Sequence, residues 1–399
     1  VSTGGGQWLL DPYNITISTG ADASTTNSSN TFTASSSGGV INVGTLKSAL
    51  STNNVTVSTT GGGQDTGDIT LDSTVSGATN TLAWSSNKTL TLSAAGGVTG
   101  QGRISMTGGG TVIFNQAGNS TYSGVISGTG NFVKNGVGVL QIGGTADQTY
   151  TGTTRVMNGT LEIVSGRTLT WDTALTVDSG ATFKYNASMP DTTPTHVGSL
   201  AGSGTVEATG TTTTNAAFGV GQNNASTTFD GIFKGTAASS IGPLISKYGT
   251  GTFTYTGSVS GNFVGFSVGT GTVQVGNGGT EGSLGNVASI SPSVATNGTL
   301  VVNRNDTVTL TNGMIGNGLV KLVGSVTLNS NGALQNFPNL EIGTGTTLVL
   351  SGTDNIRTAL WNGGAITNNG AISLSYAILG SNVSGSGTLA VNSGNNSLQ

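Results

Sequence analysis

The segment that decides the fold runs Gly128-Thr-Gly-Asn-Phe132-Val-Lys134-Asn-Gly136-Val-Gly138-Val-Leu140-Gln-Ile142, and continues in Tyr150-Thr-Gly-Thr-Thr-Arg-Val156-Met-Asn-Gly-Thr-Leu161-Glu-Ile163. Apolar and polar residues alternate in short bursts, and Gly or Asn separates one burst from the next. Successive side chains of a strand point to opposite faces, so this pattern predicts short, half-buried strands joined by tight turns.

The same organisation extends along the chain. Period-two bursts occur at Ile15–Ile17, Val55–Val57, Leu90–Leu92, Val112–Phe114, Leu161–Ile163 and Val308–Leu310. Looser echoes of the repeat occur at Ser246–Tyr255, Gly316–Lys321 and Asn297–Leu300. A unit of this size cannot bury its own apolar face, so the units must stack on one another.

Charge content decides how the units stack. Antiparallel sandwiches place many charged residues on their outer faces, whereas a parallel β-helix stacks each side chain on its equivalent one coil away and avoids like charges there. Charged residues are only 7% of this chain, and Thr, Ser and Asn occupy the polar positions. We therefore predict an all-β fold, a right-handed parallel β-helix, with roughly 20 coils of about 20 residues each.

Helical signals are sparse. The best candidate is one or two turns over Thr45–Leu50, with Thr45 as the capping residue. Neither Val1–Gly4 nor Asn392–Gln399 supplies a helical or charged cap for an open coil. Unpaired edge strands are templates for further pairing, so we expect copies to associate end to end or a neighbouring domain to cover each end.

Composition excludes several classes of protein. The chain has no Cys, which rules out disulfides and thiolate metal sites, and its 12 basic residues are too dispersed for a nucleic-acid footprint. No stretch approaches 18 consecutive apolar residues, so no membrane-spanning helix is predicted. With 34% hydrophobic residues and a net charge of −4, the chain is not typical of disordered proteins.

Two stretches resemble known families. The opening Gly4-Gly-Gly-Gln-Trp8-Leu-Leu-Asp-Pro12-Tyr-Asn-Ile15-Thr-Ile17, followed by Ile41–Val57, Gly67–Leu71 and Lys88–Ala94, resembles filamentous-haemagglutinin-like exoproteins of two-partner secretion. Gly128–Ile163 resembles the β-strand repeat of autotransporter passengers. The resemblance implies a haemagglutinin-like β-helical segment over residues 1–100 and an autotransporter-repeat-like β-helix over 101–399, continuous with the first.

The resemblance also implies secretion through an outer-membrane translocator and a place on the bacterial cell surface. We expect a shaft or scaffold segment that acts in adhesion or cell–cell contact, not an enzyme. Expected partners are glycans or proteins of a host or neighbouring cell, or like molecules joined end to end. The alternative is a carbohydrate-active β-helix enzyme, a polysaccharide lyase or glycoside hydrolase.

Catalysis of that kind needs grouped carboxyl groups. The nearest groupings in sequence are Asp65, Asp68 and Asp72, and Asp172 with Asp178, which we interpret as turn-closing residues. Gly62–Thr70 resembles one calcium-binding nonapeptide, but calcium rolls need such units in tandem. His196, the sole histidine, follows Pro194 and is predicted to be a surface loop residue. We assign no catalytic, cofactor-binding or metal-binding residue, and expect no cofactor.

Two further sets of residues remain open. Trp84, Trp171 or Trp361 could form a sugar-binding platform, although buried packing is the favoured interpretation. Asn-x-Ser/Thr sequons, which include Asn54, Asn87, Asn119, Asn158, Asn224 and Asn297, are candidates for glycosylation.

Overall fold

The structure is a computed structural model that describes residues 12–60, 63–164, 168–186, 195–209, 216–235, 243–285, 293–310, 315–330, 339–351, 359–362, 364–392 and 397–398. About 55% of the chain is strand and 4% is helix, in stacked parallel sheets that form a β-solenoid of about 14 turns. The predicted all-β parallel β-helix is confirmed. The chain divides into two compact units, Val1–Lys184 and Tyr185–Gln399, which are described separately.

The coils are longer than the sequence suggested, which explains why there are about 14 turns rather than roughly 20. In the first unit, 20 positions separate the hydrogen-bonded Tyr122 and Gly102 of neighbouring coils, and 23 separate Arg155 and Asp178. The separation is larger near the start of the unit, where the register partners Ile69 and Val98 are 29 positions apart. In the second unit the corresponding separations reach 26 and 27, as for Asn224 with Thr250 and Glu207 with Lys234.

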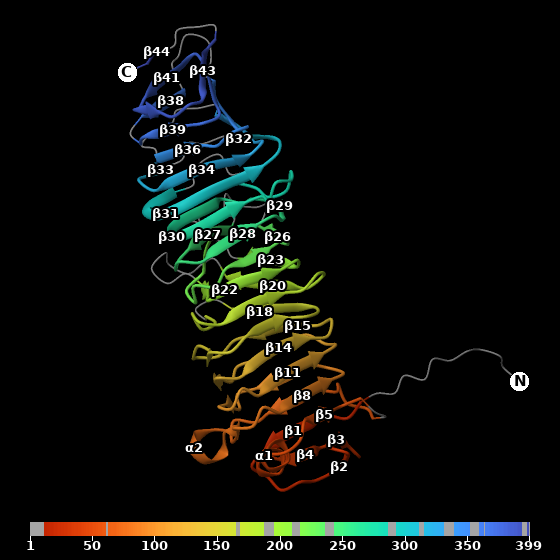
Figure 1. Ribbon diagram of the computed structural model, residues 1–399. Helices are drawn as coiled ribbons and strands as arrows, with labels where there is room; N and C mark the ends of the chain where they lie inside the picture. Colours follow the sequence, from red (N-terminus) through yellow and green to blue (C-terminus); the bar gives the residue numbers. More distant parts are fainter. Residues whose placement is uncertain are drawn as a thin grey trace, which may run out of the picture. The chain divides into compact units, whose positions relative to one another are not determined.

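The first unit stacks three short strands per coil (Figure 1). One face contains β4 (Gly39–Asn42), β1 (Ile15–Ser18), β6 (Ile69–Leu71), β9 (Val98–Gly100), β12 (Ser120–Tyr122), β15 (Val139–Ile142) and β18 (Thr160–Ile163). A second contains β7 (Leu82–Trp84), β10 (Ile104–Met106), β13 (Ile126–Gly128) and β16 (Thr149–Tyr150). The third contains β2 (Thr25–Ser28), β3 (Thr31–Ala34), β5 (Val55–Ser58), β8 (Thr89–Ala94), β11 (Thr111–Gln116), β14 (Asn131–Asn135), β17 (Thr154–Val156) and β19 (Ala174–Val177). β20 (Thr182–Asn186) crosses the boundary between the units.

The parallel register places equivalent residues in columns. Leu90, Val112 and Phe132 are register partners in β8, β11 and β14, and all three are buried. They form part of an interior that excludes water and supplies most of the stability. The pairing of β8 with β11 joins residues before and after position 100, so the solenoid is continuous there, while the division by family resemblance stays a prediction.

Glycine shapes the corners. Gly128 has a φ of 96°, and a Cβ on it would lie 2.2 Å from the carbonyl oxygen of Met106 in the preceding coil. Gly130 donates its N–H to that same oxygen. The pairs Gly100 with Gly102 and Gly316 with Gly318 repeat this corner. Only glycine adopts this positive φ without strain and leaves room for the carbonyl oxygen of the preceding coil.

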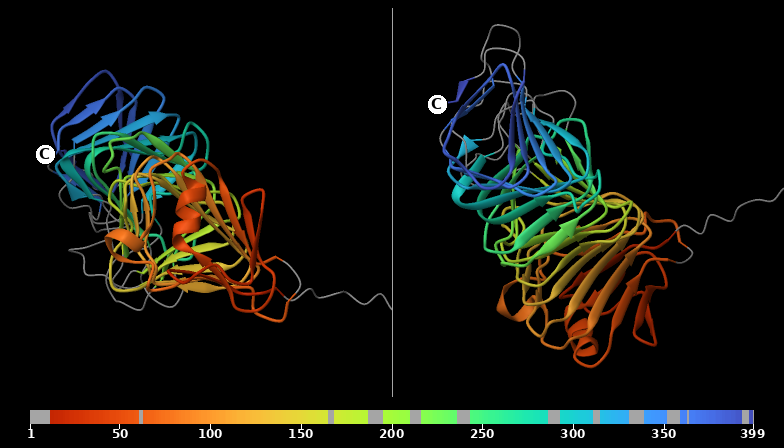
Figure 2. Two further views of the ribbon diagram at one scale, coloured as in Figure 1. Left: turned by 90° about the horizontal axis from the view of Figure 1, so that it is seen from below. Right: turned by 45° about the horizontal axis from the view of Figure 1, so that its top comes forward.

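The first coil is closed by a helix, α1 (Val43–Leu50), which lies at that end of the first unit in the left view of Figure 2. Leu46 and Leu50 are fully buried. The predicted cap was wrong: the Asn42 side chain accepts the N–H of Gly44, whereas Thr45 donates its hydroxyl to Asp22. A second short helix, α2 (Gly77–Asn80), was not predicted.

The third face of the first unit ends in an antiparallel hairpin, because β2 pairs antiparallel with β3 while β3 pairs parallel with β5. Residues 25–50 therefore cover this end of the described first unit. The expectation about Val1–Gly4 concerns residues outside the described ranges.

The second unit has the same architecture and contains two longer strands, Gly265–Val275 and Ser293–Arg304. Its first coils contain β21 (Thr195–Val197), β22 (Ser199–Gly202), β23 (Thr205–Thr209), β24 (Ala216–Val220), β25 (Thr227–Phe229), β26 (Ile232–Lys234), β27 (Pro243–Lys247), β28 (Thr252–Tyr255) and β29 (Ser258–Ser260). Next come β30 (Gly265–Val275), β31 (Ser293–Arg304), β33 (Ile315–Gly316), β34 (Leu319–Gly324), β36 (Asn339–Ile342), β39 (Ile366–Asn368) and β42 (Val383–Ser384). Another sheet contains β32 (Thr307–Leu310), β35 (Thr327–Ser330), β37 (Thr347–Ser351), β40 (Ala371–Ser375) and β43 (Thr388–Val391), and the last contains β38 (Ala359–Asn362), β41 (Ala377–Gly380) and β44 (Ser397–Leu398).

Candidate functional site

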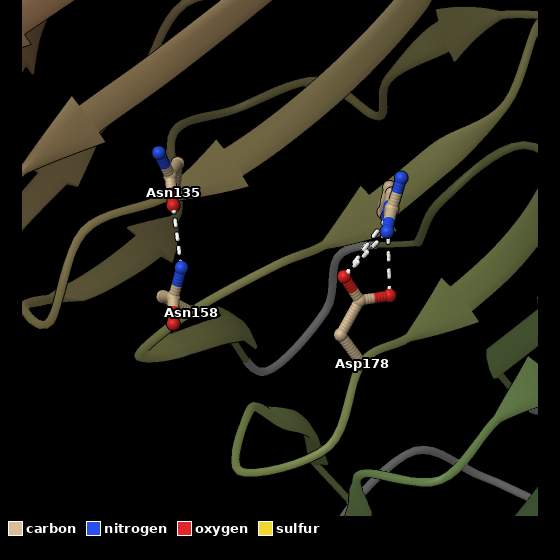
Figure 3. A network of polar contacts seen from close by, with 4 residues as sticks. Asn135, Asn158 and Asp178 are labelled. Carbon is tan, nitrogen blue, oxygen red and sulfur yellow. Dashed lines mark hydrogen bonds and ion pairs between the residues drawn. The ribbon is translucent and has the colours of Figure 1, made fainter.

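Polar side chains form a row with two hydrogen-bonded pairs on the outside of the first unit. We name Ser93, Asn115, Asn135 and Asn158 the Asn135 ladder. Asn115 donates from Nδ2 to Ser93 Oγ at 3.1 Å, and Asn158 donates from Nδ2 to Asn135 Oδ1 at 2.8 Å (Figure 3). The row satisfies polar groups between coils without introducing charge.

A second row runs along an adjacent face. We name Thr70, Thr99, Thr121, Gln141 and Glu162 the Gln141 ladder. The hydroxyls of Thr70 and Thr99 are 3.0 Å apart, and Gln141 donates from Nε2 to Glu162 Oε2 at 3.1 Å. Thr121, Gln141 and Glu162 line an open groove of about 460 Å³. Hydroxyl, amide and carboxylate groups of this kind can donate to and accept from a sugar.

Some charged residues on the outer surface form ion pairs with opposite charges of the neighbouring coil. Arg155 and Asp178 are 2.8 Å apart, and the hydrogen bond that the Arg155 guanidinium donates to the Asp178 carboxylate raises the pKa of Arg155 (Figure 3 shows the contacts of Asp178). Lys321 and Glu341 are register partners at 2.7 Å. At these positions the neighbouring coils therefore place opposite charges, not like charges, side by side, as expected for a parallel stack.

The acidic candidates serve as structural hydrogen-bond acceptors. Asp72 accepts the N–H of Thr74, and this bond lowers the pKa of Asp72, which confirms the turn interpretation at that position. Asp65 and Asp68 link coils instead: Asp65 accepts from the N–H of Asn14, and Asp68 accepts from the N–H of Gly97. Their bonds to other coils make them stabilisers of the stack.

The remaining acidic candidates are Asp172, which is exposed in the turn before β19, and Asp178, which pairs with Arg155. Within the described ranges, no three His, Cys, Asp or Glu side chains gather as a metal site would require. Folding without a metal stays a prediction, and melting curves with and without a chelator would test it.

His196 is not a surface residue. It lies in β21, is 3% exposed, and its ring centroid is 5.5 Å from that of Tyr248. The prediction failed because the position was judged from Pro194, which lies outside the described residues, rather than from the apolar Val197 that follows.

The tryptophans differ in environment. Trp84 is buried and donates its indole N–H to the carbonyl of Lys88, as the packing interpretation requires. Trp171 is 51% exposed, so burial was the wrong prediction there. The side chain of Trp361 lies outside the described residues. An open groove of about 790 Å³ lies beside Trp84 and is lined on one side by Lys47 and Ser48 of α1.

The six sequon asparagines named above are all exposed. Three of them accept a backbone N–H of the following coil through their side-chain oxygen: Asn54 from Thr89, Asn119 from Val139 and Asn224 from Thr250. These residues therefore hold corners together. Their glycosylation stays a prediction.

Two interior lysines were missed by the sequence analysis. Lys134 is 0% exposed and donates from Nζ to the carbonyls of Asn135, Gly136 and Asn158, while Lys247 is 1% exposed. Lys247 donates in the same way to the carbonyls of Tyr248 and Gly249. Burial lowers the pKa of each lysine to about 8. The period-two pattern of the strands indicates that both lysines point inward. Lys134 stands two residues after the buried Phe132, and Lys247 stands two residues after the buried Ile245.

Comparisons with protein-family models, with curated proteins and with solved structures found no match. No helix in the described part of the chain has the length and apolar character of a membrane span.

Proposed function

We propose that this chain is a shaft or scaffold segment of a secreted, surface-exposed bacterial exoprotein that acts in adhesion or cell–cell contact. The observation that carries the proposal is the outer surface, where the Asn135 and Gln141 ladders repeat hydroxyl and amide groups from coil to coil, with the carboxylate of Glu162 as their one charged member. Such a surface can make many weak contacts at the spacing of the coils, and many weak contacts add up to strong attachment.

The proposed partners are glycans or proteins on host or neighbouring cells, with an outer-membrane translocator as a transient partner during secretion. The resemblance of Gly4–Ile17 and Gly128–Ile163 to exoprotein families supports this location. A neutral, hydroxyl-rich ligand could form hydrogen bonds with Gln141 and Glu162 in the groove that they line. Nucleic acid is not a proposed partner, since the chain carries a net charge of −4.

Adhesion can be measured with beads that carry the chain at graded densities. We expect retention on epithelial or bacterial cells to rise steeply with density, because attachment is multivalent, and to persist in high salt, because neutral contacts are not screened. The variant Thr121→Lys/Gln141→Lys should reduce retention, and Thr121→Ser/Gln141→Asn should not. Retention equal to that of uncoated beads, or abolished by salt, would refute the proposal.

The same preparation tests the enzymatic alternative. We expect no unsaturated or reducing products from pectin, alginate or glycosaminoglycan. Turnover that disappears in Glu162→Gln or Asp68→Asn, in chains whose circular dichroism is unchanged, would establish the enzyme instead.

A further inference from the structure

The groove beside Trp84 combines one positive charge with several hydroxyl groups, and we name it the α1 groove. Its volume of about 790 Å³ lies in the range that is typical of small-ligand sites. Among the described residues that line it, Lys47 alone carries a charge. Its lining also includes Ser48, Ser51, Ala83, Ser85 and Thr107.

Lys47 is oriented by the neighbouring helix. Its Nζ donates to the carbonyl oxygen of Thr79 in α2 at 2.9 Å. An ammonium group has three N–H donors, so two stay available for a ligand. The side chain is also half-buried, which restricts the positions that its charge can take. Lys47 therefore presents a positioned positive charge to the groove.

The C-terminal end of α1 does not cancel this charge. A helix of this kind ends with about half an elementary negative charge, whereas Lys47 carries a full positive one. The end is also hydrogen-bonded already. Ser51 donates its hydroxyl to the carbonyl of Ser48 at 2.6 Å, and Ser86 donates its hydroxyl to that of Leu50 at 2.6 Å. The local electrostatic field therefore favours an anionic group in the groove.

The strand β7 has an open edge because α1 takes the place of a strand. In a later coil, β10 lies between β9 and β11 along the chain, and in the first coil α1 occupies the equivalent place between β4 and β5. β7 is consequently the terminal strand of the order β16-β13-β10-β7, and α1 lies against it. An element within the chain thus determines this edge.

The main-chain groups of Ala83 face the open edge. Leu82 donates its N–H to the carbonyl of Arg103, next to β10. Trp84 accepts the N–H of Thr107 on the same side. Alternate residues of a parallel strand bond to opposite neighbours, so the N–H and C=O of Ala83 point away from β10, toward α1. Within the described ranges, neither group has a hydrogen-bond partner.

We propose that the α1 groove binds an acidic sugar, whose carboxylate pairs with Lys47. The ring hydroxyls of the sugar bond to Ser48, Ser85 and Thr107, which are exposed and can each donate and accept, and to the main chain of Ala83. A neutral sugar makes the same hydroxyl contacts but lacks the charge-assisted bond, so the carboxylate gives the selectivity. This site is separate from the Gln141 ladder, and its ligand is acidic rather than neutral.

Binding is measured by titrating the 399-residue chain with a trimer of galacturonic acid and, separately, with a trimer of galactose. We expect the acidic trimer to bind at least about tenfold more tightly. Lys47→Met should remove this preference, and Lys47→Arg should keep it. Lys321→Met, which removes the same charge from β34 of the second unit, is the matched control and should leave both affinities unchanged.

A blocking substitution tests the location independently of charge. Thr107 is exposed at the groove, so Thr107→Tyr should fill it and abolish binding of the acidic trimer without disturbing the core. Thr151 occupies the equivalent corner two coils later, because Met106 and Tyr150, which precede the two threonines, are both register partners of Gly128. Thr151→Tyr is the control and should bind the trimer as the wild-type chain does.

Three outcomes would overturn the proposal: no binding of the acidic trimer, equal affinity for both trimers, or binding that is unchanged in Lys47→Met or Thr107→Tyr. High salt should weaken binding of the acidic trimer, because it screens an exposed ion pair. Bead retention through the Gln141 ladder is expected to persist in high salt, so the two proposals can fail separately.

Discussion

At the scale of single residues, Lys134 and Lys247 place amino groups against corner carbonyls inside the coil. Burial lowers the pKa of both from 10.5 to about 8. Between those pH values the unfolded chain holds protons that the folded chain has lost, so the free energy of unfolding rises with pH. Burial also raises the pKa of Tyr122, Tyr150 and Tyr185, so above pH 10 the unfolded tyrosines ionise first and stability falls.

We therefore predict that stability rises from about pH 8, reaches a maximum at about pH 10 and then falls. Each lysine should contribute on the order of 2 kcal/mol to the rise. Urea unfolding at stepped pH measures this. Lys134→Met should remove part of the rise, whereas Lys321→Met, a surface control, should not. A profile that is flat between pH 8 and 10 in the wild-type chain would contradict the assignment of both lysines to the interior.

At the scale of a corner, glycine at position 128 should be irreplaceable. Gly128→Ala combines a φ of 96° with a Cβ placed 2.2 Å from the Met106 oxygen. We expect a loss of about 3–5 kcal/mol in the free energy of unfolding. Gly109→Ala is the matched control: its φ is 75°, but nothing lies within 4 Å of the added Cβ. It should cost about 1–2 kcal/mol. Equal losses, measured by urea titration, would show that the corner can relax.

At the scale of the element, α1 should stabilise the first coil through its buried face. Leu46 is 0% exposed, so Leu46→Ala is expected to cost about 2–5 kcal/mol, because the small side chain leaves a cavity. Ser48→Ala, on the exposed side of the same helix, should change stability by less than about 0.5 kcal/mol. Hydrogen exchange should locate the loss in α1, β4 and β5. Unchanged protection there in Leu46→Ala would exclude α1 as the cap.

Most strands could be predicted because their burial follows period two, as at Leu90 and Leu92 of β8. The alternation fails as a guide where one residue is gained or lost. In Gly316–Lys321 the sequence echoes Gly128–Lys134 with one residue fewer, and Lys321 consequently points outward to Glu341 while Lys134 points inward. A shift of one residue reverses every face. The echo therefore holds at the glycine corner, where Gly316 and Gly318 repeat Gly128 and Gly130, and fails in the strand that follows.

The candidate surface was less predictable than the strands. Composition indicated an outer face of Thr, Ser and Asn, but which residues form one ladder depends on coil length, which varies from coil to coil. Gln141 contacts both Thr121 and Glu162 only because the coils have matching lengths. Thr121 lies 20 positions before Gln141, and Glu162 lies 21 positions after it. Nothing local to Gln141 identifies those partners.

At the scale of the molecule, a solenoid is a one-dimensional stack in which each coil contacts only its neighbours, so a whole coil should be removable. Deleting Val112–Asn131 joins Thr111 to Phe132, which is the register partner of Val112. Phe132 then takes the inward place of Val112 above Leu90. We expect this chain to keep its β-type circular dichroism and a single cooperative unfolding transition. If the ladders carry adhesion, bead retention should fall with the loss of their members.

The control deletion, Ile113–Asn131, is one residue shorter and places Phe132 at the outward position of Ile113. It should expose Phe132 and turn Val133 and Asn135 inward, which reverses both faces of the strand. We expect loss of cooperative unfolding or aggregation during expression. If both deletions fold equally well, the interior columns do not determine register. If neither folds, the coils are not the independent units that a stacked solenoid requires.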